Sequence, residues 1–164
     1  MKVVLFFLVP FFLIACSTNI PSSARLNWQY NHSTDVAHFK VNRSIPHKVK
    51  GKTCGIVWEL ETVEVFKGSL KPGDYIQVWG PSDPQTWSGE SEELMFLRKY
   101  DGQGTSECSK HLFKNYKMIH WGCCRITQKN GQQEVIFFRL KNSNEVGEYI
   151  PVDSSKVFDK LRSY

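Results

Sequence analysis

The spacing of apolar residues between positions 55 and 79 predicts a β-hairpin, which we take as the centre of the fold. Its first strand carries apolar side chains at alternate positions, at Ile56, Trp58 and Leu60. Residues 71–74, Lys-Pro-Gly-Asp, then form a turn, because proline restricts φ and glycine tolerates unusual backbone conformations. The alternation resumes in residues 75–79, so both strands present an apolar face to a common core.

The phase of this alternation shifts by one residue after Thr62. Val63 and Val65 then take the inward positions, while Glu64 faces solvent. A strand that shifts phase without a bulge would turn every later side chain to the wrong face. We therefore expect a β-bulge near Thr62, which also adds the twist that a small barrel requires.

Similar patterns predict four further strands, at residues 35–41, 93–98, 116–127 and 134–140. The second of these is apolar on both faces and is expected to be the most buried strand. The last two flank Asn130-Gly131, a pair whose residues readily adopt positive φ in a hairpin turn. With the central hairpin, the chain is expected to contain six strands.

One helix is expected at the C-terminus. Asp153 provides an N-cap, and Val157, Phe158 and Leu161 recur at helical spacing. The elements together predict an all-β protein with a C-terminal helix, most simply a small antiparallel barrel. With 41% hydrophobic and 13% aromatic residues, the chain has enough apolar material for one core in a single domain spanning residues 35–164.

The N-terminus differs from the rest, because residues 3–14 form an apolar run interrupted only by Pro10. This run is short for a membrane span and typical of a signal-peptide core. It ends in Leu-Ile-Ala-Cys at 13–16, which resembles the lipobox of bacterial lipoproteins. The resemblance implies a signal peptide over residues 1–15 and a lipidated, palmitate-bearing Cys16 in the cell envelope. The alternative is an ordinary secretory signal with a chance cysteine.

Residues 16–34 are polar and are expected to form a flexible tether between the lipid and the domain. Under the sorting rule of enterobacteria, Ser17 after the lipidated cysteine implies delivery to the outer membrane. The membrane, reached through the lipid anchor, is then the first expected partner.

The net charge of +5 is modest, but it is unevenly distributed. No acid occurs between Asp35 and Glu59, and residues 42–52 within that interval carry Arg43, Lys48, Lys50 and Lys52. We expect a mobile basic loop here that binds anionic head groups, an envelope polymer or an acidic protein. The alternative is a solvated loop without a binding role. Trp87, in a loop rich in proline and small polar residues, is a second candidate for binding, and no nucleic-acid partner is expected.

Three short motifs resemble the netrin-like family, which includes the tissue inhibitors of metalloproteinases. They are Val-Phe-Lys-Gly at 65–68, Pro-Gly-Asp at 72–74 and Leu-Met-Phe-Leu at 94–97. The resemblance covers residues 35–162 and implies an OB-like barrel with a terminal helix. Because such barrels bind many kinds of ligand, the fold alone does not identify a partner.

Four cysteines remain after Cys16, namely Cys54, Cys108, Cys123 and Cys124. An even number in an exported chain favours two disulfides. A bridge between the adjacent Cys123 and Cys124 is disfavoured because it strains the backbone. We therefore expect Cys54 and Cys108 each to pair with one member of that doublet, one bridge lying inside the barrel and one outside.

Zinc binding is the alternative use of these cysteines, with Cys108, His111, Cys123 and Cys124 as ligands. Adjacent strand residues point apart, however, so Cys123 and Cys124 are poorly placed to bind one ion. The sequence contains no recognisable catalytic motif and implies no cofactor. It therefore favours a membrane-anchored, non-enzymatic binding domain of the envelope, with a small envelope hydrolase or zinc protein as the alternative.

Overall fold

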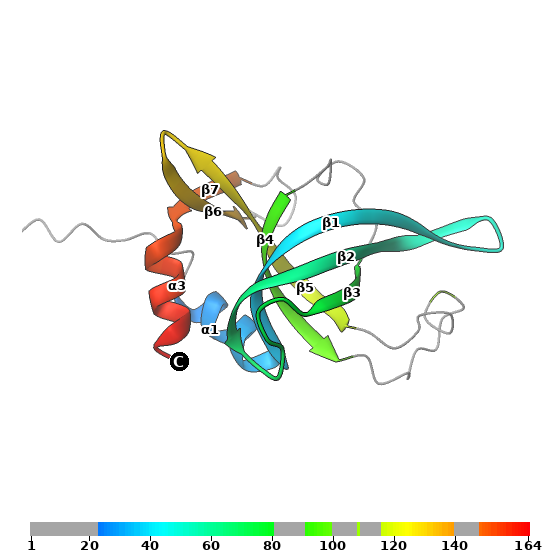
Figure 1. The fold of residues 1–164 in the computed structure, drawn as a ribbon, viewed down its shortest axis with the longest axis horizontal. Coiled ribbons are helices and arrows are strands. Elements are labelled where there is room, and N and C mark those ends of the chain that lie inside the picture. The colour runs from blue at the N-terminus through cyan, green and yellow to red at the C-terminus, as the bar shows by residue number, and fades with distance from the viewer. Residues whose placement is uncertain (1–22, 81–90, 100–107, 109–115, 140–147) are drawn as a thin grey trace, which may run out of the picture.

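The computed structural model describes residues 23–80, 91–99, 108, 116–139 and 148–164. The elements in these ranges are α1 (Ser23–His32), β1 (Asp35–Val49), β2 (Lys52–Lys67), β3 (Tyr75–Gly80), β4 (Ser91–Lys99), β5 (Tyr116–Lys129), β6 (Gln132–Arg139), β7 (Glu148–Asp153) and α3 (Ser154–Arg162). The fold is thus mostly β with a C-terminal helix, as the pattern predicted (Figure 1). No helix in the described ranges is long and apolar enough to cross a membrane.

The described strands form one seven-stranded sheet in the order β3-β2-β1-β4-β5-β6-β7, and each neighbouring pair is antiparallel. β3 makes an additional, parallel pairing with β5, through Val78 opposite Tyr116 and Trp79 opposite Lys117. The sheet therefore curls far enough to bring β3, at one end of the order, beside a strand from its middle.

The expected bulge is present in β2. Val63 has no partner on β1, because His38 pairs with Glu64 and the next residue, Phe39, pairs with Thr62. The prediction that Val63 faces inward is wrong, because its side chain is 44% exposed and Thr62 is buried instead. Val63 is the extra residue of the bulge, and the strand resumes its alternation after it. Val65 packs against the core, as expected.

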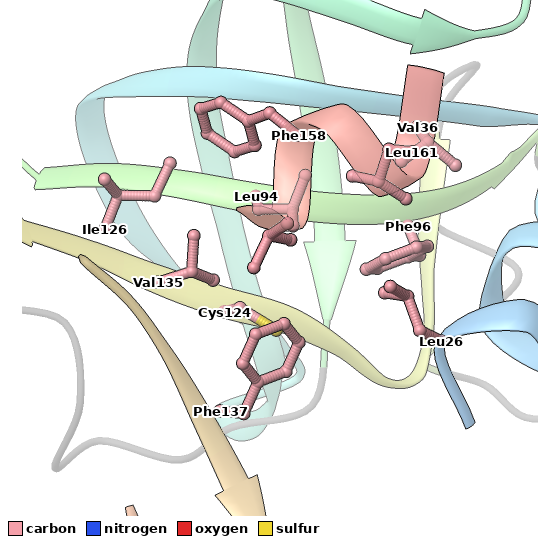
Figure 2. Close-up of a cluster of buried hydrophobic side chains, with 11 residues drawn as sticks. Leu26, Val36, Leu94, Phe96, Cys124, Ile126, Val135, Phe137, Phe158 and Leu161 are labelled. Carbon is pink, nitrogen blue, oxygen red and sulfur yellow. The ribbon is translucent and has the colours of Figure 1, made fainter. Parts of the chain in front are cut away.

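Apolar side chains gather on both faces of the sheet. The cluster without residues from α1 or α3, here called the inner cluster, comprises Ala37, Phe39, Val41, Trp58, Leu60, Val78, Met95 and Leu97. The helix-side cluster comprises Leu26, Val36, Leu94, Phe96, Cys124, Ile126, Val135, Phe137, Val157, Phe158 and Leu161. Figure 2 shows Leu26 from α1 and Phe158 and Leu161 from α3 approaching the sheet residues of this second cluster.

β4 contributes alternately to both clusters, with Leu94 and Phe96 on the helix side and Met95 and Leu97 on the inner side. Every residue from Glu93 to Leu97 is fully buried, which agrees with the prediction for this segment. A strand between two packed layers has no solvent face, so its sequence shows an apolar run rather than alternation.

α3 has the predicted cap and the predicted buried face. Asp153 accepts hydrogen bonds from the Ser155 amide at 2.8 Å and from the Ser155 hydroxyl at 2.6 Å. These bonds lower the pKa of the Asp153 carboxyl. Val157, Phe158 and Leu161 are buried against the sheet, so the helix covers one face of it.

α1 lies within the segment expected to be a flexible tether, so that expectation is wrong for residues 23–32. Leu26 of α1 is buried in the helix-side cluster. Basic side chains donate hydrogen bonds to carbonyl groups at the C-terminal end of the helix, where the helix dipole is negative. Lys67 Nζ donates to Tyr30 O at 2.6 Å, and Arg98 Nη2 donates to His32 O at 3.0 Å. These partners come from β2 and β4, and local sequence did not reveal them.

β7 is a strand that the sequence pattern did not predict. It pairs with β6 from Glu148 opposite Arg139 to Asp153 opposite Glu134. Pro151 lies within it, and proline is tolerated there because β7 stands at the end of the strand order. The hairpin between β5 and β6 is as predicted, with positive φ at Asn130 and Gly131.

Candidate functional site

The most distinctive surface feature is a two-stranded extension of β1 and β2, which we call the arm (residues 42–55). β4 pairs with β1 only as far as Val41, and β3 pairs with β2 only from Ile56 onward. Beyond those points the two strands pair only with each other among the described strands. Figure 1 shows the arm projecting from the sheet to one end of the molecule. The expected mobile basic loop is therefore wrong, because ladder pairing continues to Val49 opposite Lys52.

The arm ends in a two-residue turn formed by Lys50 and Gly51, with φ of 50° and 79°. Positive φ at both central residues is the geometry that matches the twist of a tight hairpin. The turn brings three of the predicted basic residues together at its tip, since Lys48, Lys50 and Lys52 are all exposed and lie within five positions. No acidic residue occurs in the arm.

Arg43, the fourth predicted basic residue, lies at the base of the arm rather than at its tip. It donates from Nε and Nη2 to the two carboxylate oxygens of Glu59, both at 3.0 Å. These hydrogen bonds lower the pKa of Glu59 and raise the pKa of Arg43. The charge of Arg43 is thus matched by Glu59, and Arg43 lies apart from the lysines at the tip.

The base of the arm is held by close packing between Gly55 and β3. Gly55 has φ of 142°, and an added Cβ would come within 2.5 Å of both the Gly80 carbonyl oxygen and Trp79 Nε1. Only glycine therefore allows the indole of Trp79 to pack directly on the arm.

A disulfide also ties the arm to the rest of the chain. Cys54 is bonded to Cys108, with Cα atoms 5.4 Å apart. The expected pairing of each of these cysteines with Cys123 or Cys124 is wrong. Cys54 and Cys108 are bonded to each other, so neither sulfur is left to bond to Cys123 or Cys124.

Cys124 is a buried free thiol in the helix-side cluster. Burial raises the pKa of this thiol, and the carboxylate of Glu93 raises it further. The thiolate needed for nucleophilic attack or zinc binding is therefore disfavoured. Because Cys108 is engaged by Cys54, it is also unavailable as the zinc ligand that the alternative hypothesis requires. Among the described residues, no group of three or more His, Cys, Asp or Glu side chains is placed to hold a metal.

A second candidate surface is a groove of about 480 Å³ over β1, β4, β5 and β6. Its lining residues are Lys40, Ser91, Glu92, Arg125, Ile126, Thr127, Gln128 and Gln133. The Glu92 carboxylate oxygen Oε2 lies 3.1 Å from His38 Nε2 and accepts a hydrogen bond from Gln133 Nε2 at 3.1 Å. Sequence reasoning did not select this group, and its contacts come from three strands. Because these polar side chains hydrogen-bond to one another across strands, we interpret them as a network that stabilises the sheet.

Three of the predicted site residues lie outside the described ranges, namely Cys16, Trp87 and His111. The side chain of Cys123 also lies outside the description, although its backbone pairs with Met95. Comparison with protein families, with curated proteins and with solved structures finds no match to this chain.

Proposed function

We propose that this protein is a lipid-anchored lipoprotein of the bacterial envelope that acts by binding, and that the arm contacts an anionic partner. The observation that carries the proposal is the cluster of three exposed lysines at the tip of the arm. Their charges lie at the end of a projecting hairpin, where an acidic protein or an anionic envelope polymer can approach from several sides. Like charges held close together on a surface attract anions more strongly than dispersed ones do.

Two features favour the arm as a binding element over a solvated loop. Its backbone is held by ladder pairing up to the turn, and Cys54–Cys108 joins it covalently to a distant part of the chain. A rigid element loses less conformational entropy on binding than a mobile loop. The lipid anchor itself rests on the sequence, through the apolar run and Leu-Ile-Ala-Cys at 13–16, and Ser17 supports an outer-membrane location.

We infer further that β1 to β5 form an OB-like barrel, as the resemblance to the netrin-like family implies. The support is the short parallel pairing of β3 with β5, at Val78 opposite Tyr116 and Trp79 opposite Lys117, which brings together two strands that such a barrel would join. The inner cluster, which draws on β1, β2, β3 and β4, is the apolar interior that such a barrel requires.

The anchor is tested by growing cells with labelled palmitate. The wild-type protein should incorporate label, and Cys16→Ser should not, because the thiol is the acceptor. Equal labelling of both proteins would refute the lipid anchor and leave the role of the arm to a separate test.

The arm is tested with the unlipidated Cys16→Ser protein and isolated envelope fractions. Changing Lys48, Lys50 and Lys52 to Glu should weaken cosedimentation at least about tenfold, since one lysine beside an anionic surface contributes on the order of a fivefold change. Wild-type binding should also fall with added salt. The matched control changes three other exposed lysines to Glu, Lys71, Lys129 and Lys156, which alters net charge equally. If both triple variants bind like the wild type, the arm has no such role.

A further inference from the structure

α1 begins close to the proposed lipid anchor along the chain. Six residues separate Cys16 from Ser23, the first residue of α1. A fully extended chain advances about 3.3–3.6 Å per residue, so Ser23 lies within about 25 Å of the lipidated cysteine in any conformation. If Cys16 carries lipid, as proposed above, the domain is therefore held close to the membrane surface.

The outward face of α1 presents an aromatic side chain suited to that surface. Trp28 is 50% exposed and stacks on the exposed His32, with ring centroids 4.3 Å apart. On the opposite face, Leu26 and Gln29 are buried against the sheet. Tryptophan is favoured at a membrane–water interface because its large ring is apolar while its N–H remains hydrogen-bonded.

The charges around α1 complement anionic lipid head groups. The helix contains Arg25 and no acidic residue. Exposed Arg98 lies at its C-terminal end, where its guanidinium contacts the His32 carbonyl, and Lys67 contacts the Tyr30 carbonyl. Basic side chains beside an exposed tryptophan form the combination by which proteins bind anionic membrane surfaces.

We propose that this face of α1 lies in the head-group layer of the membrane that holds the anchor, with Trp28 inserted at the interface and Arg98 beside anionic lipid phosphates. The inference rests on the proposed lipid anchor and adds an orientation to it. In Figure 1, α1 and α3 lie towards one end of the long axis, and the turn of the arm lies at the other. With α1 on the membrane, the turn of the arm lies at the other end of the molecule from this contact.

The test uses the full lipidated protein reconstituted in vesicles of phosphatidylethanolamine and phosphatidylglycerol with brominated acyl chains. Bromine quenches tryptophan fluorescence only at short range, so it reports insertion directly. We expect the wild type to float with the vesicles and to be quenched, and Trp28→Phe to float equally but lose most of the quenching. The matched control, Trp79→Phe, changes a tryptophan at the base of the arm and should keep the wild-type quenching.

The outcomes separate this inference from the anchor on which it rests. Protein that does not float refutes the anchor and the orientation together. Protein that floats while wild type and Trp28→Phe are quenched equally refutes the orientation alone. A third outcome is that brominated lipid does not quench Trp28, and that aqueous iodide fails to quench it only when envelope protein is added. That result assigns this face of α1 to a protein partner and also refutes the proposal.

Discussion

Removing the Cys54–Cys108 disulfide gives a direct test of the arm's attachment. The bond closes a loop with a sequence separation of 54 residues. In the chain-entropy description, a cross-link of this span restricts the unfolded chain enough to contribute about 4 kcal/mol to folding stability at 25 °C. The perturbation is the double change Cys54→Ser and Cys108→Ser, because a single change would leave one thiol free to form a new bridge.

The assay is urea denaturation of the Cys16→Ser protein and of the same protein carrying the double change. The free energy of unfolding should fall by up to about 4 kcal/mol in the double variant. The dependence on urea should steepen, because an unfolded chain without the cross-link exposes more surface. Peptide mapping without reductant should recover residues 54 and 108 in one linked pair.

Two results would refute this reasoning. The first is a double variant within about 0.5 kcal/mol of its parent, the range of a neutral surface substitution. The second is a linked peptide that joins Cys54 or Cys108 to the Cys123–Cys124 doublet, which would restore the pairing expected from sequence. As a control, Cys124→Ala should leave the Cys54–Cys108 link intact, since Cys124 is a free thiol.

Three further predictions follow from burial, capping and thiol chemistry. Phe96→Ala should lower the free energy of unfolding, measured by urea denaturation, by about 3–5 kcal/mol because Phe96 is fully buried. Val63→Ala, at the exposed bulge, should change it by no more than about 0.5 kcal/mol. Similar losses in the two variants would contradict the assigned register. Hydrogen bonds from Ser155 lower the pKa of Asp153 in the folded state, so their stabilisation is present above the ordinary aspartate pKa and is lost as pH falls through the lower folded value. The thermal midpoint of Asp153→Asn should therefore fall less on acidification than that of the wild type. An equal fall in both proteins would show that the Asp153 cap does not contribute to the acid sensitivity. Cys124 should resist iodoacetamide in the folded protein at pH 8 and react in urea, and rapid native labelling would show that its thiol is accessible.

Much of the secondary structure followed from local pattern alone. The central hairpin, the double-faced burial of β4, the Asn130-Gly131 turn and the cap at Asp153 depend on residues close together in sequence. Period-two alternation and turn chemistry act over a few residues, so they can be recognised without knowing the fold. The bulge near Thr62 was also visible, since a change of phase is itself a local signal.

The arm was missed because its strands do not bury a continuous apolar face. Residues 42–52 are largely polar and basic, and Pro46 lies within them, so they have the composition of a loop. They form a ladder because the strands they continue are already paired in the body of the sheet. Once Val41 and Leu60 are in register, each further pair forms without the loop-closure entropy that an isolated hairpin must overcome.

By itself the sequence determined the class of fold, most of the strands and the presence of a C-terminal helix, because these depend on side-chain periodicity. Only the tertiary structure decided which cysteines bond, since that depends on which segments far apart in sequence come within bonding distance. It also separated Arg43, which bonds to Glu59, from the lysines gathered at the tip of the arm. It placed α1 against the sheet through Leu26 and through cations from β2 and β4. These features are contacts between distant segments, and the free energy of such a contact belongs to the pair rather than to either segment alone.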